Sequence, residues 1–283
     1  MKSRRFSAAS LALFLSALAF ALAGCGDSSG DNGMNNPPPT PSITATNQAL
    51  GDLSTVVNVP GAVSVGPGWV VIHENAGGSP GPVIGWTAVP SGTSSDIDVV
   101  LDRPAVDAET LHAMLHIDAG TIGSYEFPGP DAPAVDQDEA VVVEPLRVGV
   151  AAGTPAVRLR VTAIGTSSYN FTSAEPTRYA NAIGPESGDE TITLRSGWRY
   201  EIVNSASGGH PFELIAAGIS QNPDAVRLSQ QSNGSLEADV SVAWFDDGNQ
   251  TIRFTASTAL QNAVDGYRCS IHTTTMRGEV EFE

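Results

Sequence analysis

Residues 266–282 read GYRCSIHTTTMRGEVEF and place a polar loop between two short strand patterns. Gly266–Cys269 and Gly278–Phe282 are short, begin at glycine and contain aromatic or β-branched residues, which is typical of β-strands. The loop between them is rich in Ser and Thr. It holds three residues with chemistry of their own, Cys269, His272 and Met276, within eight positions. The stretch therefore predicts a strand pair whose connecting loop carries a functional group.

The same pattern extends backward over 155–283. Short apolar runs alternate there with Gly, Pro and Asn, and eight such runs predict a β-sandwich or a barrel. Two intervening stretches, 173–190 and 220–235, are predicted to be polar loops. The predicted strands are Val157–Ala163, Thr191–Leu194, Arg199–Val203, Phe212–Ile215, Ala238–Phe245, Thr251–Thr255, Gly266–Cys269 and Gly278–Phe282.

A second β region is predicted over 43–148, where apolar runs are again broken by Gly and Pro turns. Thr110–Ile117 fits a strand better than a helix. In a strand, one face carries Leu111, Ala113, Leu115 and Ile117, while the other carries His112, Met114, His116 and Asp118. The other predicted strands are Val70–Ile72, Val83–Ile84, Ile97–Leu101 and Ala140–Val143. We therefore predict an all-β protein with two β-sandwich domains in tandem, 43–148 and 155–283.

Composition agrees with this class and excludes others. The chain has 283 residues, 41% of them hydrophobic, with 29 Gly and 19 Pro, so it is long enough for two packed, turn-rich domains. It carries 31 acids against 14 bases, a formal charge of −17. Nucleic acid is excluded as a partner, because binding phosphates requires clustered Lys and Arg. Two cysteines are too few for a disulfide scaffold.

The N-terminus reads as an export signal. A basic start with Lys2, Arg4 and Arg5 precedes an apolar stretch, Leu11–Ala23, that is too short to span a bilayer as a mature helix. The stretch ends in Leu22-Ala23-Gly24-Cys25, which resembles the lipobox of prokaryotic lipoproteins. The resemblance implies a signal peptide over 1–24 and a lipid on Cys25.

A tether is predicted over 25–42, flexible and rich in Gly, Ser and Asn first and stiffened by proline afterwards. The lipid would fix the protein to a membrane, in the periplasm or at the cell surface. The signal peptide contains three of the bases and no acid. The mature chain therefore carries 11 bases, all Arg, and a formal charge of −20.

Cys269 is then the remaining thiol, in an exported and oxidising compartment without a disulfide partner. With His272 and Met276 beside it and His210 at the start of another predicted strand, it completes the ligand set of a type 1 copper site. In such a site one thiolate and two imidazoles form a trigonal plane and a weak thioether lies on the axis. Structural zinc usually takes four strong ligands, and calcium and magnesium prefer carboxylates, so none of these three ions fits this ligand set.

This C-terminal region resembles the cupredoxins, the plastocyanin-like blue copper proteins. The resemblance covers about 130 residues and includes Tyr169-Asn170-Phe171, the Leu194–Gly197 turn, the His210 segment and the Cys-His-Met loop. It implies a Greek-key sandwich in which His210, Cys269 and His272 are equatorial copper ligands and Met276 is the axial one. The family often has Asn or Asp after the first histidine, with an amide donating to the thiolate. Pro211 stands there instead and has no N–H.

Residues 43–148 resemble a domain of unknown function found in archaeal and bacterial cell-surface proteins. The resemblance implies a small β-sandwich and no activity. It rests on four segments in order, Gly68–His73, Val83–Gly85, Met114–Asp118 and Tyr125–Gly129.

Weaker patterns lie in the same region. His112, Met114 and His116 point the same way in a strand, so a second, weaker copper site is one interpretation, and a polar outer face is the favoured one. Asp118–Gly123 faintly follows a calcium loop but lacks its later carboxylates, which favours a plain turn. A solvated acidic loop is predicted for Asp131, Asp136, Asp138 and Glu139.

The favoured function is electron transfer by one copper cycling between Cu(II) and Cu(I), with a redox protein as partner. We expect no enzyme activity, because a nucleophile elbow, a P-loop and a dinucleotide fingerprint are all missing from the sequence. Two alternatives stay open. One is an envelope scaffold or binding lipoprotein with a structural cupredoxin-like domain, and the other is copper sequestration or delivery.

Overall fold

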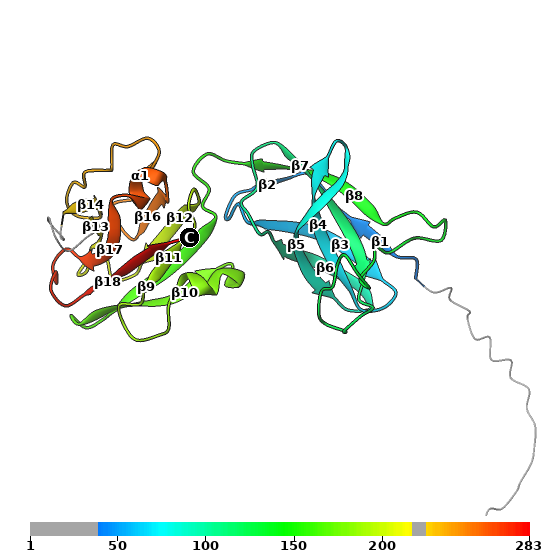
Figure 1. Ribbon diagram of the computed structural model, residues 1–283, viewed down its shortest axis with the longest axis horizontal. Coiled ribbons are helices and arrows are strands. Elements are labelled where there is room, and N and C mark those ends of the chain that lie inside the picture. The colour runs from blue at the N-terminus through cyan, green and yellow to red at the C-terminus, as the bar shows by residue number, and fades with distance from the viewer. Residues whose placement is uncertain (1–38, 217–224) are drawn as a thin grey trace, which may run out of the picture. The chain divides into compact units, whose positions relative to one another are not determined.

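The chain's structure is a computed structural model that describes residues 39–216 and 225–283 (Figure 1). Strands dominate these residues, whose helices are the 3₁₀ segment η1 (Thr177–Ala182) and the single-turn α1 (Thr258–Gln261). The predicted all-β class, with two sandwiches in tandem, is confirmed. No helix in the described ranges is long and apolar enough to cross a bilayer. The predicted signal peptide, Cys25 and most of the tether lie outside these ranges.

The first sandwich is built from two sheets. The smaller sheet has the strand order β1-β3-β6, and the larger has the order β2-β8-β7-β4-β5. Their facing apolar side chains form one core, with Val57 and Val99 from the smaller sheet and Ile72 and Leu115 from the larger. The strands are β1 (Ser42–Thr44), β2 (Gln48–Leu50), β3 (Val56–Ser64), β4 (Gly68–Ala76), β5 (Ser79–Val89), β6 (Gly92–Val100), β7 (Glu109–Ile117) and β8 (Val143–Val150).

Strand β7 has the alternation predicted from its sequence as far as His116, but Ile117 is 42% exposed and lies outside the core. Leu111, Ala113 and Leu115 belong to the core between the sheets. The opposite face, with His112 and His116, is buried as well. It is covered because the segment between β7 and β8 folds back, so that Phe127 packs edge-on against His116 with ring centroids 4.8 Å apart. The predicted polar outer face is therefore a second buried layer.

The second sandwich also has two sheets, with strand orders β10-β9-β12-β16-β15 and β11-β18-β17-β13-β14. Tyr169, Tyr200, Phe212, Phe254 and Tyr267 are fully buried between them. The strands are β9 (Val157–Ile164), β10 (Ser168–Glu175), β11 (Ile192–Leu194), β12 (Arg199–Asn204), β13 (Phe212–Ala216), β14 (Val226–Ser229), β15 (Phe245–Asp246), β16 (Thr251–Thr255), β17 (Val264–Cys269) and β18 (Arg277–Phe282).

Two local predictions in this sandwich are wrong. The predicted strand Ala238–Phe245 is a series of turns, of which only the last residue enters β15. The Asp239 carboxylate accepts hydrogen bonds from the amide and hydroxyl of Ser241, a local pattern that competes with strand pairing. The predicted polar loop 220–235 contains β14, which pairs with β13.

Candidate metal centre

The predicted ligands lie at one end of the second sandwich, next to the neighbouring strands β13 and β17 of the sheet β11-β18-β17-β13-β14. Strands β13 and β17 are antiparallel neighbours, with Phe212 opposite Cys269. His210 comes two residues before the first of these and Cys269 ends β17. The loop that follows carries His272 and Met276 before β18 begins at Arg277. The pairing of β13 with β17 therefore brings His210 next to the loop after Cys269, although the two are 59 residues apart in the sequence.

Three of the four predicted ligands point at one another. Cys269 Sγ lies 3.8 Å from His210 Nδ1 and 3.6 Å from His272 Nδ1. One donor atom from each residue falls within 4.8 Å of the others. The two imidazole rings are 4.8 Å apart between centroids. Cys269 is fully buried, whereas both histidines are partly exposed at the surface.

The Cys269 sulfur is held by its own loop. It accepts the backbone N–H groups of Ile271 and His272, each with a nitrogen–sulfur distance of 3.4 Å. The loop is closed because the Cys269 amide donates to the Met276 carbonyl at 2.9 Å, and the Met276 amide donates to the His272 carbonyl at 3.0 Å. Pro211 cannot donate to the sulfur, and its carbonyl accepts from the Ser270 amide instead.

The His210 backbone is fixed by two side chains. Its carbonyl accepts from the Tyr169 hydroxyl at 2.7 Å and from Asn204 Nδ2 at 2.8 Å. Asn204 also donates to Gln230 Oε1, which accepts from the amide of Phe212 as well. Tyr169 lies in a segment that carries the cupredoxin resemblance. Asn204 and Gln230 were not predicted, because single polar residues at or next to the ends of separate strands leave no pattern in the sequence.

Two pKa shifts are relevant to this arrangement. Burial, and then the neighbouring His272, lower the pKa of His210, which keeps the imidazole neutral at neutral pH. A neutral imidazole has the free lone pair that a metal needs. Burial raises the pKa of Tyr169 above its ordinary value, so its hydroxyl stays protonated and can donate.

Met276 is fully buried in the same apolar cluster as Cys269. The axial role of its thioether stays a prediction.

Arg268, next to Cys269 in the sequence, forms a buried ion pair with Glu213. Its Nε donates to Glu213 Oε2 at 2.9 Å, and the exposed fractions of the two side chains are only 12% and 3%. Glu213 also accepts from the hydroxyls of Ser229 and Ser232. This buried pair joins β13 to β17 at the residues that precede Cys269 and follow His210. We therefore assign Arg268 to positioning these strands.

The residues present fit a copper ion by the chemistry of their donor set. A thiol sulfur and two imidazole nitrogens converge, and the group contains no carboxylate. Soft sulfur with imidazole selects copper over hard cations, and three strong ligands are one fewer than structural zinc usually takes.

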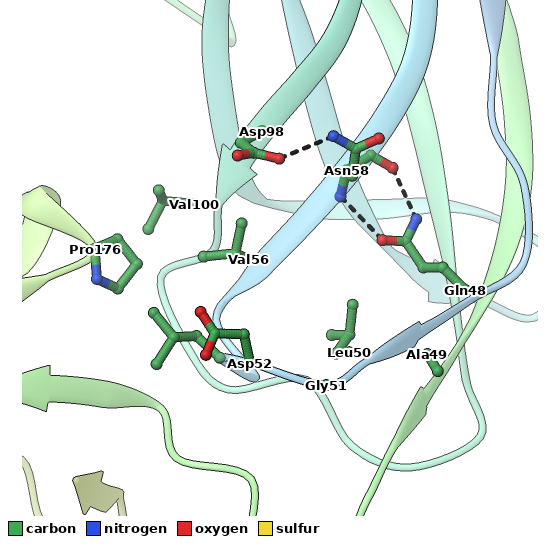
Figure 2. Close-up of a pocket in the computed structure, with 11 residues that line it drawn as sticks. Gln48, Ala49, Leu50, Gly51, Asp52, Val56, Asn58, Asp98, Val100 and Pro176 are labelled. Atoms are coloured by element: carbon green, nitrogen blue, oxygen red, sulfur yellow. Dashed lines mark hydrogen bonds between the residues drawn. The ribbon is translucent and has the colours of Figure 1, made fainter.

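A separate pocket in the first sandwich is lined by residues of β2, β3 and β6 (Figure 2). Its polar groups are already bonded to one another. Gln48 donates to the Asn58 carbonyl and accepts from the Asn58 amide, while Asn58 Nδ2 donates to Asp98 at 2.9 Å. These bonds connect β2, β3 and β6. We assign this pocket a structural role, since its polar atoms have partners.

Comparison with known proteins identifies the first region more directly than the second. Residues 41–147 match the family described as "Domain of unknown function (DUF7282)". Cell surface glycoprotein 2 of Haloarcula hispanica is 35% identical over 89 residues, which are 31% of this chain and 9% of that protein. The chain thus spans a small part of that relative. Both matches confirm the resemblance stated for the first sandwich.

Two solved structures align with the chain at low sequence identity. Rusticyanin from Thiobacillus ferrooxidans is 17% identical, with a TM-score of 0.24, over 44% of this chain and 76% of its own. Laccase from Botrytis aclada is 12% identical, with a TM-score of 0.21, over 84% and 53% of the two chains. At TM-scores this low, the alignments bear on neither the fold nor the function of this chain.

Proposed function

We propose that this protein is an extracytoplasmic, lipid-anchored copper protein that carries electrons by cycling one copper ion between Cu(II) and Cu(I). The observation behind this proposal is the convergence of His210 Nδ1, Cys269 Sγ and His272 Nδ1 at one end of the second sandwich. These three residues, together with Met276, would hold the ion. When bound, copper supplies a one-electron couple.

The protein's own residues suit electron transfer in three ways. Buried Cys269 keeps water from the sulfur, while partly exposed His272 offers a path to the surface. Backbone hydrogen bonds within the loop hold the sulfur in place. The His210 carbonyl is fixed by Tyr169 and Asn204. A site held this firmly rearranges little between oxidation states, which favours fast transfer.

We propose no enzymatic role and no bond chemistry at this site. The partner would be another redox protein, met outside the cytoplasm. The match of the first sandwich to a cell surface glycoprotein supports an extracytoplasmic location. The lipid anchor on Cys25 is proposed from the sequence alone. The first sandwich would place the copper domain at a distance from the membrane.

Titration of the full, detergent-solubilised chain with Cu(II) tests the proposal. We expect an intense blue absorption from Cu(II)–thiolate bonding that saturates at one copper per chain. Full loading without this absorption would favour copper storage or delivery. Absence of tight binding would contradict the copper proposal and leave the envelope scaffold as the function.

A further inference from the structure

Two histidine nitrogens and one methionine sulfur lie close together on the buried outer face of β4 and β7 in the first sandwich. His73 on β4 and His116 on β7 approach each other with their Nε2 atoms 3.4 Å apart. Met114 Sδ lies 3.2 Å from His116 Nε2. All three side chains are buried, with exposed fractions of 3%, 0% and 6%. They lie on the side of the sheet away from the core, since Ile72 and Leu115 belong to that core.

Backbone carbonyls fix the tautomers of both histidines. His73 Nδ1 lies 2.8 Å from the Gly81 carbonyl oxygen, and His116 Nδ1 lies 2.9 Å from the Asp131 carbonyl oxygen. A carbonyl oxygen can only accept, so each Nδ1 carries the proton and donates. In a neutral imidazole the other nitrogen is then an unprotonated acceptor. The two facing Nε2 atoms are therefore both lone-pair donors.

Neither of the two facing Nε2 atoms carries a hydrogen atom, so they cannot form a hydrogen bond with each other. A thioether sulfur is also only a weak acceptor, so Met114 cannot donate to His116 either. An added proton would create a hydrogen bond between the two rings. Both rings are buried, however, and burial disfavours the positively charged imidazolium. Burying three acceptors that face one another without a partner is unfavourable, and a bound cation would satisfy all three.

We propose that His73, Met114 and His116 form a second metal site in this protein, specific for a soft monovalent ion, Cu(I). Thioether sulfur selects Cu(I), and imidazole binds copper in either oxidation state. With metal–nitrogen bonds of about 2.0 Å, two nitrogens 3.4 Å apart subtend about 116° at the metal. That angle is near the roughly 120° of a planar three-coordinate site.

The surroundings favour a single positive charge. Asp131 is fully buried, and its own carbonyl accepts from His116. Its carboxylate accepts hydrogen bonds from the amides of Ala119 at 3.0 Å and Glu126 at 2.7 Å, which stabilise the charged form. The carboxylate therefore stays charged near the site. The prediction that Asp131 is solvated is wrong, because it anchors the covering segment.

Aromatic rings close the site. Phe127 packs edge-on against His116, and its centroid lies 6.2 Å from that of His73. Tyr125 stacks on Trp86 at 4.8 Å and lies 5.9 Å from His116. This cover excludes most water, which protects a Cu(I) ion and weakens competition from hydrated divalent cations.

Anaerobic competition between the full chain and a chromophoric Cu(I) chelator tests this site. The wild-type chain is expected to bind two Cu(I) ions. A Cys269→Ser/His272→Ala background, which disables the site in the second sandwich, is expected to retain one. In that background Met114→Leu conserves the side-chain volume but removes the sulfur. We expect the Cu(I) affinity to fall by at least about 10-fold, and the sulfur signal to vanish from the copper X-ray absorption spectrum.

His73→Gln in the same background is expected to weaken Cu(I) binding at least as strongly. The matched control is His112→Gln, on the same strand face as Met114, because His112 Nε2 is bonded to Asn75 Oδ1 at 3.0 Å and lies outside the cluster. It should keep the background affinity, and thermal unfolding will show that all variants are folded. The proposal is overturned if the background chain binds no Cu(I), or if Met114→Leu and His73→Gln bind as the control does.

Discussion

A Cys269→Ser chain is expected to lose the blue Cu(II) absorption completely and to bind Cu(II) more than about 100-fold more weakly. Loss of a residue that only supports a ligand already costs 10- to 100-fold, and Cys269 is proposed as the ligand itself. The serine oxygen can accept the same two amide hydrogens, from Ile271 and His272, so the loop should keep its shape. Absorption titration with Cu(II) measures both effects.

Ser270→Ala provides the neighbouring control. The Ser270 hydroxyl donates to Gln231 Oε1 at 2.5 Å and is not among the groups around the sulfur. This variant should keep both the absorption and the affinity. Undiminished absorption in Cys269→Ser would mean that copper is bound elsewhere in the chain.

Arg268→Met is expected to lower the free energy of unfolding by about 3–5 kcal/mol, the cost of leaving one partner of a buried ion pair uncompensated. The variant removes the arginine partner of Glu213, whose side chain is 3% exposed. Among the described residues, the hydroxyls of Ser229 and Ser232 remain as its side-chain partners. Urea denaturation of the copper-free chain measures the loss directly.

Arg160→Met is the matched comparison in the same sandwich. Arg160 pairs with Glu175 at 2.6 Å, but the side chains are 45% and 34% exposed, so water screens the pair. Its removal should cost about 0–1 kcal/mol. An equal loss in the two variants would show that burial of the Glu213–Arg268 pair does not govern the stability of β13 and β17.

The parts of the structure that depend on neighbours in sequence could be predicted. The alternation of apolar and polar residues predicted the two faces of β7. Three of the proposed ligands fall within 269–276, so their spacing could be recognised in the sequence. Strand pairing over long distances could not be read in this way. The partner of His116 is His73, which is 43 residues away and reaches it only through the register of β4 against β7.

Polarity alone was a poor guide to burial. Asp131 lies among acidic residues and looks solvated, yet amide groups of its own loop surround its carboxylate. In the opposite direction, Ala238–Phe245 has the apolar content of a strand. Its side-chain hydrogen bonds form turns instead, which outweighs β propensity.

Voltammetry of the full chain loaded with one equivalent of copper tests the central claim most directly. We expect a reversible one-electron wave from the wild-type chain. Its reversibility would reflect a site already fixed by the loop around Cys269 and by the bonds to the His210 carbonyl. Cys269→Ser should remove the wave. A chain that binds copper at this site but gives no reversible wave would contradict electron transfer as the function.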